Sequence, residues 1–184
     1  MIVSRSLSLC FLALSAYAAS FDLDSSRTEI GFTLHDVLHT VHGTFRMKYG
    51  SIQWDPETGK ASGLVVVDVA SGASGSGVRD RRMHQEILES ERYPNAVFTP
   101  DRVEGQVALQ GLSHVDVHGM LLIHGDQHEL VLHIIVQANG SQYLVSTHFT
   151  IPYVEWGMKN PSNFLLKVDG KVEMDVHAVT QAHT

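Results

Sequence analysis

Histidine is the residue type in this sequence that is best suited to metal binding or catalysis, and there are 12 histidines in 184 residues. His35, His39 and His42 have the spacing of one helical face, but the segment that carries them is too short and poorly capped to form a helix. His114 and His118 share a face of an expected strand, yet they lie two strand repeats apart, too far for one tetrahedral ion. No His-x-His or Cys pair occurs, so the sequence predicts no metal site.

Hydrolytic chemistry has equally little support in the motifs. The sequence contains no Gly-x-Ser-x-Gly elbow. Its neighbouring carboxylates Glu86, Glu89 and Glu91 are expected on the solvated face of a helix. The partners of a Ser/His/Asp triad can be distant in sequence, so a Ser/His or metal-dependent hydrolase stays as the alternative function. The sequence favours a binding protein over an enzyme.

Residues 1–18 have the features of a secretory signal peptide. Arg5 supplies the positive start, Leu7 to Ala16 is mostly apolar, and Ala16-Tyr17-Ala18 fits the small-x-small cleavage rule. The apolar run is too short to span a membrane. We therefore expect a signal peptide over 1–18, a single domain over 19–184, and a periplasmic or secreted location. The only cysteine, Cys10, is removed with the signal peptide.

Composition narrows the class of partner. The formal net charge is -7, and no stripe of Lys and Arg accompanies it, which argues against a nucleic-acid partner. A hydrophobic fraction of 43% over 184 residues is enough for one domain with a substantial core.

The stretch from Ser113 to Ile151 must position whatever site the protein has. Apolar residues alternate with polar ones over 115–123, 130–136 and 143–151, the pattern of strands with one face toward a core. Asn139-Gly140 is a hairpin signal, because a type I′ turn needs positive φ at both central positions. Three long antiparallel strands joined by tight turns are typical of a barrel.

The rest of the chain extends this pattern. Further strands are expected over 30–34, 41–54, 64–69, 96–98 and 103–109, and a last hairpin of 164–168 with 172–176 around Asp169-Gly170. Arg79 to Arg92 is the one expected helix, with Met83, Ile87 and Leu88 as its apolar stripe. The fold class is therefore all-β, an antiparallel barrel of about nine strands with one inserted short helix. Barrels of this size either fill their interior or hold one ligand, and the alternation leaves both open.

Ordered motifs along the chain resemble the YceI-like family of bacterial polyisoprenoid-binding proteins. They are Leu23-Asp24-Ser25, Ile30-Gly31-Phe32-Thr33-Leu34-His35, Val41-His42-Gly43-Thr44-Phe45, Val67-Asp68-Val69-Ala70-Ser71, Arg79-Asp80, Arg92-Tyr93-Pro94 with Phe98, Val117-His118-Gly119-Met120-Leu121-Leu122-Ile123-His124-Gly125, and Trp156-Gly157-Met158. One departure is the acidic segment Asp126-Gln127-His128-Glu129, where the family usually has a basic turn.

The resemblance implies a lipocalin-like barrel whose apolar channel holds an isoprenoid lipid or quinone, with no other cofactor and with transient contact to a membrane. The inward alternating positions would line the channel: Ile30, Phe32, Leu34, Phe45, Val65, Val67, Phe98, Leu121, Ile123, Leu132, Ile134, Phe149 and Ile151. The residues expected near the mouth or the ligand's head group are Arg79, Asp80, His84, His124 and Trp156.

Overall fold

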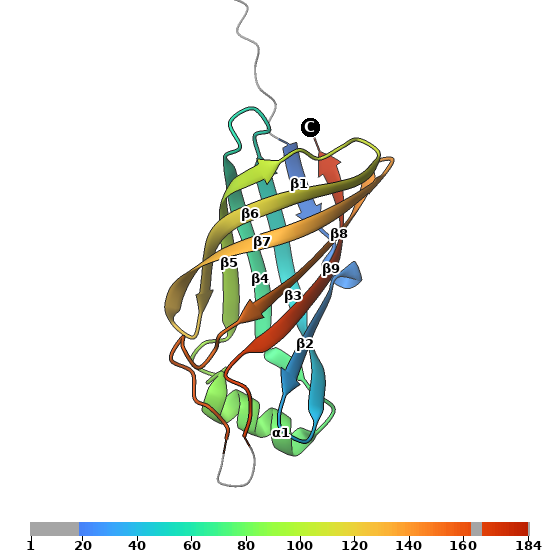
Figure 1. The fold of residues 1–184 in the computed structure, drawn as a ribbon. Coiled ribbons are helices and arrows are strands. Elements are labelled where there is room, and N and C mark those ends of the chain that lie inside the picture. Colours follow the sequence, from blue (N-terminus) through green and yellow to red (C-terminus); the bar gives the residue numbers. More distant parts are fainter. Residues whose placement is uncertain (1–18, 163–166, 184) are drawn as a thin grey trace, which may run out of the picture.

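The protein folds into one closed antiparallel β-barrel (Figure 1), as the computed structural model of residues 19–162 and 167–183 shows. The strands are β1 (Ala19–Leu23), β2 (Glu29–His35), β3 (Thr40–Trp54), β4 (Ala61–Ala73), β5 (Asn95–Gly105), β6 (Gly111–Ile123), β7 (Asp126–Asn139), β8 (Gln142–Ile151) and β9 (Val172–His183). Their order in the sheet is β1-β3-β2-β9-β8-β7-β6-β5-β4, and pairing of β3 with β4 closes it. The all-β barrel with one short helix is confirmed.

Strands β1 and β2 share one place in the wall. Both pair with β3 on one side and with β9 on the other, at successive heights along the barrel. A 3-10 turn, Ser25–Arg27, separates them, and the Asp24 side chain caps it by accepting from the Ser26 backbone N–H at 2.9 Å. The nine strands therefore occupy eight positions around the barrel, a number at which the interior is just wide enough for side chains or one small ligand.

Long strands in the central part of the chain follow from the alternation seen in the sequence. β6 and β7 pair continuously from Gly111↔Ala138 to Ile123↔Asp126. The turn between them, His124-Gly125, has positive φ at both residues, as a type I′ turn requires. The β7–β8 hairpin expected at Asn139-Gly140 also forms, with Gly140 and Ser141 as its two loop residues, one position later than the sequence indicated.

Two strand assignments from the sequence were wrong. The segments 96–98 and 103–109 belong mainly to one strand, β5, which continues through Pro100 with a register shift against β6. Proline has no N–H to donate to the ladder, so within a sheet it is tolerated only where the ladder is irregular or open, as it is here. The expected last hairpin is absent from the described residues: β9 pairs with β8 and β2, and Val168 makes one isolated bridge, to Asp36. Phe164 and Leu166 lie outside the described residues.

The inserted helix begins and ends earlier than Arg79–Arg92. It runs from α1 (Gly77–Arg82) into a π-helical turn, Met83–Ile87. It stops because Glu89 adopts a left-handed conformation, with φ of 43°, and the Ser90 backbone N–H donates to the His84 carbonyl at 3.0 Å. The left-handed residue is the one usual after a helix C-terminus, here glutamate in place of glycine. The Ser90 bond spans six residues, because the last turn is π-helical. α1 lies across one end of the barrel (Figure 1).

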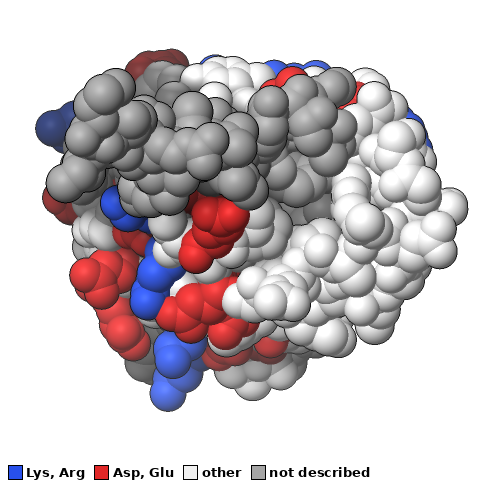
Figure 2. Space-filling model, turned by 90° about the horizontal axis from the view of Figure 1, so that it is seen from above, with Lys and Arg blue, Asp and Glu red and all other residues white. Residues whose placement is uncertain are grey.

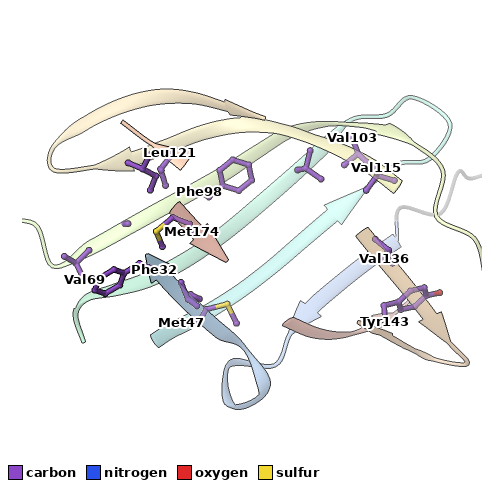
Figure 3. Packing of buried hydrophobic residues seen from close by; sticks show 14 of the residues in the cluster. Phe32, Met47, Val69, Phe98, Val103, Val115, Leu121, Val136, Tyr143 and Met174 are labelled. Atoms are coloured by element: carbon purple, nitrogen blue, oxygen red, sulfur yellow. The ribbon is translucent and has the colours of Figure 1, made fainter. Parts of the chain in front are cut away.

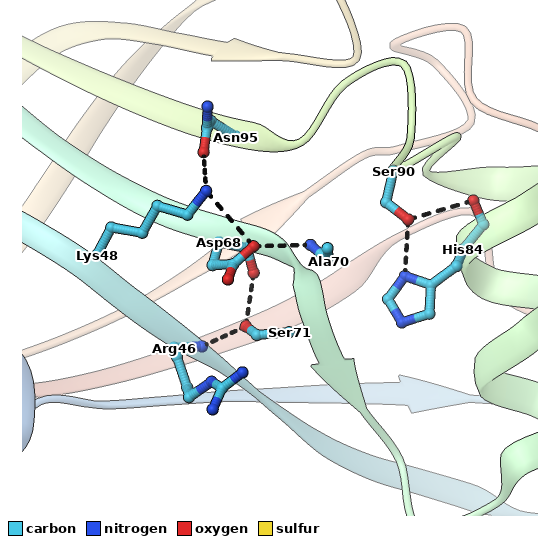
Figure 4. Close-up of polar contacts among 8 residues, drawn as sticks. All are labelled: Arg46, Lys48, Asp68, Ala70, Ser71, His84, Ser90 and Asn95. Atoms are coloured by element: carbon cyan, nitrogen blue, oxygen red, sulfur yellow. Dashed lines mark hydrogen bonds and ion pairs between the residues drawn. The ribbon is translucent and has the colours of Figure 1, made fainter.

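A bulge between β3 and β4 lies close to the inserted helix. The Arg46 backbone N–H donates to Ser71 Oγ at 2.8 Å, where the register of the two strands shifts. Ser71 Oγ in turn donates to the Asp68 carbonyl at 2.6 Å, and Lys48 bridges Asn95 and Asp68 (Figure 4). The side chain of Ser71 thus replaces a ladder bond, which lets the barrel wall change direction without an unsatisfied backbone group.

The apolar faces of all the strands point to the barrel interior. Phe32, Met47, Phe98 and Met174 come from four different strands and converge there (Figure 3). Yet in the described part of the chain no large side chain is less than 2% exposed. A tightly packed core would contain such residues, so the interior is not completely filled. None of the described helices is long and apolar enough to span a membrane.

Candidate ligand cavity

The barrel encloses a cavity of about 320 Å³ to which every strand contributes side chains. All thirteen inward positions chosen from the sequence line it: Ile30, Phe32, Leu34, Phe45, Val65, Val67, Phe98, Leu121, Ile123, Leu132, Ile134, Phe149 and Ile151. Two-residue alternation found them because a strand can turn only every second side chain inward. That they contact a ligand stays a prediction.

Sequence reasoning missed the residues that close one end of the cavity. Met83, Ile87 and Leu88 of the inserted helix line it, together with Tyr153 and Met158 of the loop after β8. The sequence showed the apolar stripe of the helix, but it did not show that this stripe faces the barrel interior. The loop residues carry no periodic signal, since they belong to no strand or helix.

The cavity wall carries no charge. Among the described residues that line it there is no Asp, Glu, Lys, Arg or His. The hydroxyls of Thr28, Thr180 and Tyr153 donate to backbone carbonyls, at 2.7, 2.8 and 2.6 Å. Burial raises the pKa of Tyr153 to about 12. Trp54 Nε1 and Thr147 Oγ1 are buried without a partner among the described residues. Such a wall suits hydrocarbon and disfavours an ionised group, whose burial without a partner is costly.

A model of the YceI-like domain matches residues 21–180. The chain belongs to the YceI-like family. The match covers nearly the whole described barrel, so the cavity is that of a YceI-like domain.

Solved structures with this YceI-like fold include a polyisoprenoid binding domain from Saccharophagus degradans, implicated in plant cell wall breakdown. It is 21% identical, with a TM-score of 0.69 over 89% of this chain and 98% of that one. BcnA of Burkholderia cenocepacia is 17% identical, with a TM-score of 0.70 over 86% and 99%. The YceI protein of Campylobacter jejuni is 17% identical, with a TM-score of 0.63 over 80% and 87%. No curated protein sequence matches the chain.

Of the five residues expected at the mouth of the YceI-like barrel, Arg79 and Asp80 both form hydrogen bonds with Ser74, in the loop just before the helix. Arg79 donates to Ser74 Oγ at 2.7 Å and to the Ser74 carbonyl at 2.8 Å. Asp80 accepts from the backbone N–H of Ser74 at 2.8 Å and from its hydroxyl. These hydrogen bonds hold the pKa of Asp80 below its usual value. Both side chains fix the start of the helix against the preceding loop.

His84 is held in the same way. Its Nε2 lies 2.8 Å from the Gly72 carbonyl. Its Nδ1 lies 3.0 Å from Ser90 Oγ, a contact drawn in Figure 4. A serine and a histidine in contact are the start of a hydrolytic dyad, but here a backbone carbonyl replaces the carboxylate, and neither residue lines the cavity. The pair ties the helix to β4, and no contact among the described residues favours the hydrolase alternative.

His124 and Trp156 lie at the helix end of the barrel with two aromatic partners. The ring centroids of His124 and Tyr93 are 4.6 Å apart. Trp156 stacks on His128, with centroids 4.0 Å apart and an interplanar angle of 6°. His128 was not among the residues chosen from the sequence, although its parity on β7 is that of Leu130 and Leu132. The structure thus separates the five mouth residues into three used for folding and two beside the barrel end.

Most of the remaining histidines lie on the outer surface. His133 Nδ1 is 2.7 Å from Asp116 Oδ1, and His148 Nδ1 is 2.8 Å from Asp175 Oδ1, in a shallow groove across β6 to β9. In the described part of the chain, no three or more His, Cys, Asp or Glu side chains are grouped so that they could hold a metal ion.

Charge is unevenly distributed around the end of the barrel opposite α1. Figure 2 looks onto that end and shows acidic and basic side chains on one side, whereas the other side, toward the β7–β8 turn, is largely uncharged. Apolar side chains are exposed on the outer faces of β6, β7 and β8, with Leu112, Ile135 and Leu144 exposed by 59%, 41% and 46%.

Proposed function

We propose that this YceI-like protein binds and carries or sequesters an amphiphile with a long isoprenoid tail, of the polyprenyl or quinone type, and that it catalyses no reaction. The observation that carries this proposal is the uncharged cavity along the barrel, lined by apolar side chains from every strand. The name of the Saccharophagus degradans relative, a polyisoprenoid binding domain with the same fold, supports it.

Burial of the tail supplies the free energy of binding. Removing apolar surface from water contributes roughly 25 cal/mol per Å² before the costs of association. For ligands of this size the net gain is about 0.3 kcal/mol per heavy atom, so a five-carbon isoprene unit contributes about 1.5 kcal/mol, or about tenfold in Kd. The tail needs no specific hydrogen bonds, which agrees with a wall whose hydroxyls mostly bind backbone carbonyls.

A periplasmic or secreted location and transient contact with a membrane belong to the same proposal. The signal-peptide pattern of residues 1–18 supports the location; these residues lie outside the described part of the chain. A carrier must take its lipid from a bilayer, and the exposed Leu112, Ile135 and Leu144 give it an apolar outer surface for that step.

The test is a series of prenyl alcohols of increasing length offered to delipidated protein. Affinity should rise about tenfold with each isoprene unit until the cavity is full, and then level off. Affinity that does not depend on tail length would refute a tail-binding cavity.

A further inference from the structure

The wall of the barrel contains a section in which two neighbouring strands are not hydrogen-bonded to each other. β7 pairs with β6 along its whole length, and β8 pairs with β9 along its whole length. Between β7 and β8, however, the ladder stops at the pair Ile134↔Thr147, which marks a fork. Beyond the fork, residues 126–133 of β7 and 148–151 of β8 form a seam, and its two edges diverge toward the end of the barrel that carries α1 (Figure 1).

Among the described residues, the polar side chains beside the fork bond away from the seam. His133 on β7 is hydrogen-bonded to Asp116 on β6, at 2.7 Å, and His148 on β8 is hydrogen-bonded to Asp175 on β9, at 2.8 Å. Each edge is thus fastened to the strand behind it and not to the other edge. The ladder between β4 and β5 is also short, but an isolated bridge beyond it joins those two segments again.

An aromatic stack joins the two sides of the seam near its wider end. His128 lies on the unpaired half of β7, and Trp156 belongs to the loop that follows β8. Their ring centroids are 4.0 Å apart and their planes are 6° apart. Among the described residues, no backbone hydrogen bond joins that loop to β7. The stack can therefore separate without breaking a strand ladder, and such a contact is worth only about as much as one hydrogen bond.

The seam lies between the ligand cavity and the outer surface. Ile134 and Thr147, the pair at the fork, line both the cavity and the shallow groove across β6 to β9. Leu132 and Phe149 line the cavity beside the unpaired edges, and Val131 is exposed on the outer face of β7. Strands β6 to β9 contain no Lys or Arg. A hydrocarbon tail that crosses the wall here therefore has apolar side chains to contact on both sides.

We propose that this seam is the portal through which the lipid tail enters and leaves the barrel. The unpaired edges of β7 and β8 move apart, and the stack of Trp156 on His128 closes the seam behind the ligand. The inference rests on the proposed function, because it assigns the path of a ligand that the cavity holds. A hydrogen-bonded section of wall opens only when its ladder breaks, so the unpaired section opens at the lowest free energy. It also opens onto the apolar outer surface proposed to meet the bilayer, so the tail is spared exposure to water.

The experiment measures how fast delipidated protein, residues 19–184, takes up a radiolabelled prenyl alcohol from phosphatidylcholine vesicles. The fork variant, His133→Cys with His148→Cys, places a disulfide one position beyond the last hydrogen-bonded pair. The only cysteine of the sequence, Cys10, is absent from this chain, so no other disulfide can form. The oxidised fork variant should take up the alcohol about tenfold more slowly than the reduced one, because the portal limits the rate. Its affinity after long incubation should be the same in both forms.

The matched control is the ladder variant, Ile135→Cys with Ser146→Cys. These two residues lie on the same outer face and are already paired within the ladder, so their oxidation should leave the rate of uptake unchanged. Trp156→Ala tests the seam independently of any disulfide. Loss of the stack should speed both uptake and release about fivefold. Trp156→Phe, which keeps an aromatic ring against His128, should stay close to wild type.

The outcomes separate the portal from the carrier function. Mass spectrometry first checks that each disulfide has formed. Equal rates in the oxidised and reduced fork variant, equal slowing by the ladder variant, or wild-type rates in Trp156→Ala would each overturn the portal. In all three cases the prenyl alcohol still binds, so the carrier function stands. If wild-type protein takes up no prenyl alcohol at all, the carrier function fails and the portal fails with it.

Discussion

Replacing Leu121 by tryptophan tests whether the barrel interior is a ligand cavity or an imperfectly packed core. Leu121 lies near the middle of the inward face, paired in register with Phe98 and His128, and is 8% exposed. An indole exceeds a leucine side chain by about 60 Å³, the share of two water molecules in the liquid. The cavity of about 320 Å³ accommodates that volume and loses about a fifth of its space. We expect Leu121→Trp to fold normally and to bind isoprenoid more weakly.

The assay is denaturant unfolding of delipidated wild-type and variant protein, together with their affinity for one prenyl alcohol. Delipidation matters because a bound ligand stabilises the native state by mass action. A filled core would instead be overpacked, at a cost of roughly 1–3 kcal/mol in the free energy of unfolding. Leu122→Trp is the matched control, since Leu122 is the next residue on β6, faces outward and is 36% exposed. Strong destabilisation by Leu121→Trp alone, in a protein whose affinity for isoprenoid is unchanged, would refute the cavity.

Three further predictions concern processing, metal and pH. Exported protein should begin at Ala19, as determined by N-terminal sequencing; a mature pool that retains Met1 would contradict the signal peptide. Chelation should leave the thermal midpoint unchanged, and a large drop that zinc alone reverses would show that the histidines hold a structural ion. The pKa of Tyr153 is raised from 10.0 to about 12, first by burial and then by the charge of Asp169, so the folded state favours the protonated phenol. The stability it contributes should be present below pH 10 and lost between pH 10 and 12, a decline that Tyr153→Phe should flatten when unfolding is followed across this range.

The inward face of the barrel was predictable because strand geometry leaves few choices. A side chain on β6 or β8 can point only in or out, so alternation identified Leu121 and Phe149 from sequence alone. The limits of β5 were not predictable, because Pro100 lies in a register shift that depends on its partner strand. The end of the helix was misplaced because Glu89 takes a left-handed conformation that normally signals glycine.

The surroundings of the residues expected at the mouth were only half predictable. Parity on β7 could have placed His128 inward, but its neighbour Trp156 lies in a loop after the next strand, and no local pattern brings the two rings together. Arg79 and Asp80 were chosen for their charge, and their role was decided by Ser74, whose hydroxyl and backbone bind both. A sequence shows which side chains are charged, whereas the fold decides which groups form hydrogen bonds or ion pairs with them.

The central claim is that the cavity holds an isoprenoid lipid. Its most direct test is native mass spectrometry of the protein purified from its own host, followed by organic extraction and identification of what is bound. We expect a mass excess that disappears on extraction and an extract that contains an isoprenoid lipid. Protein that carries no extractable lipid, and that also fails to take up prenyl alcohols after purification, would contradict the claim.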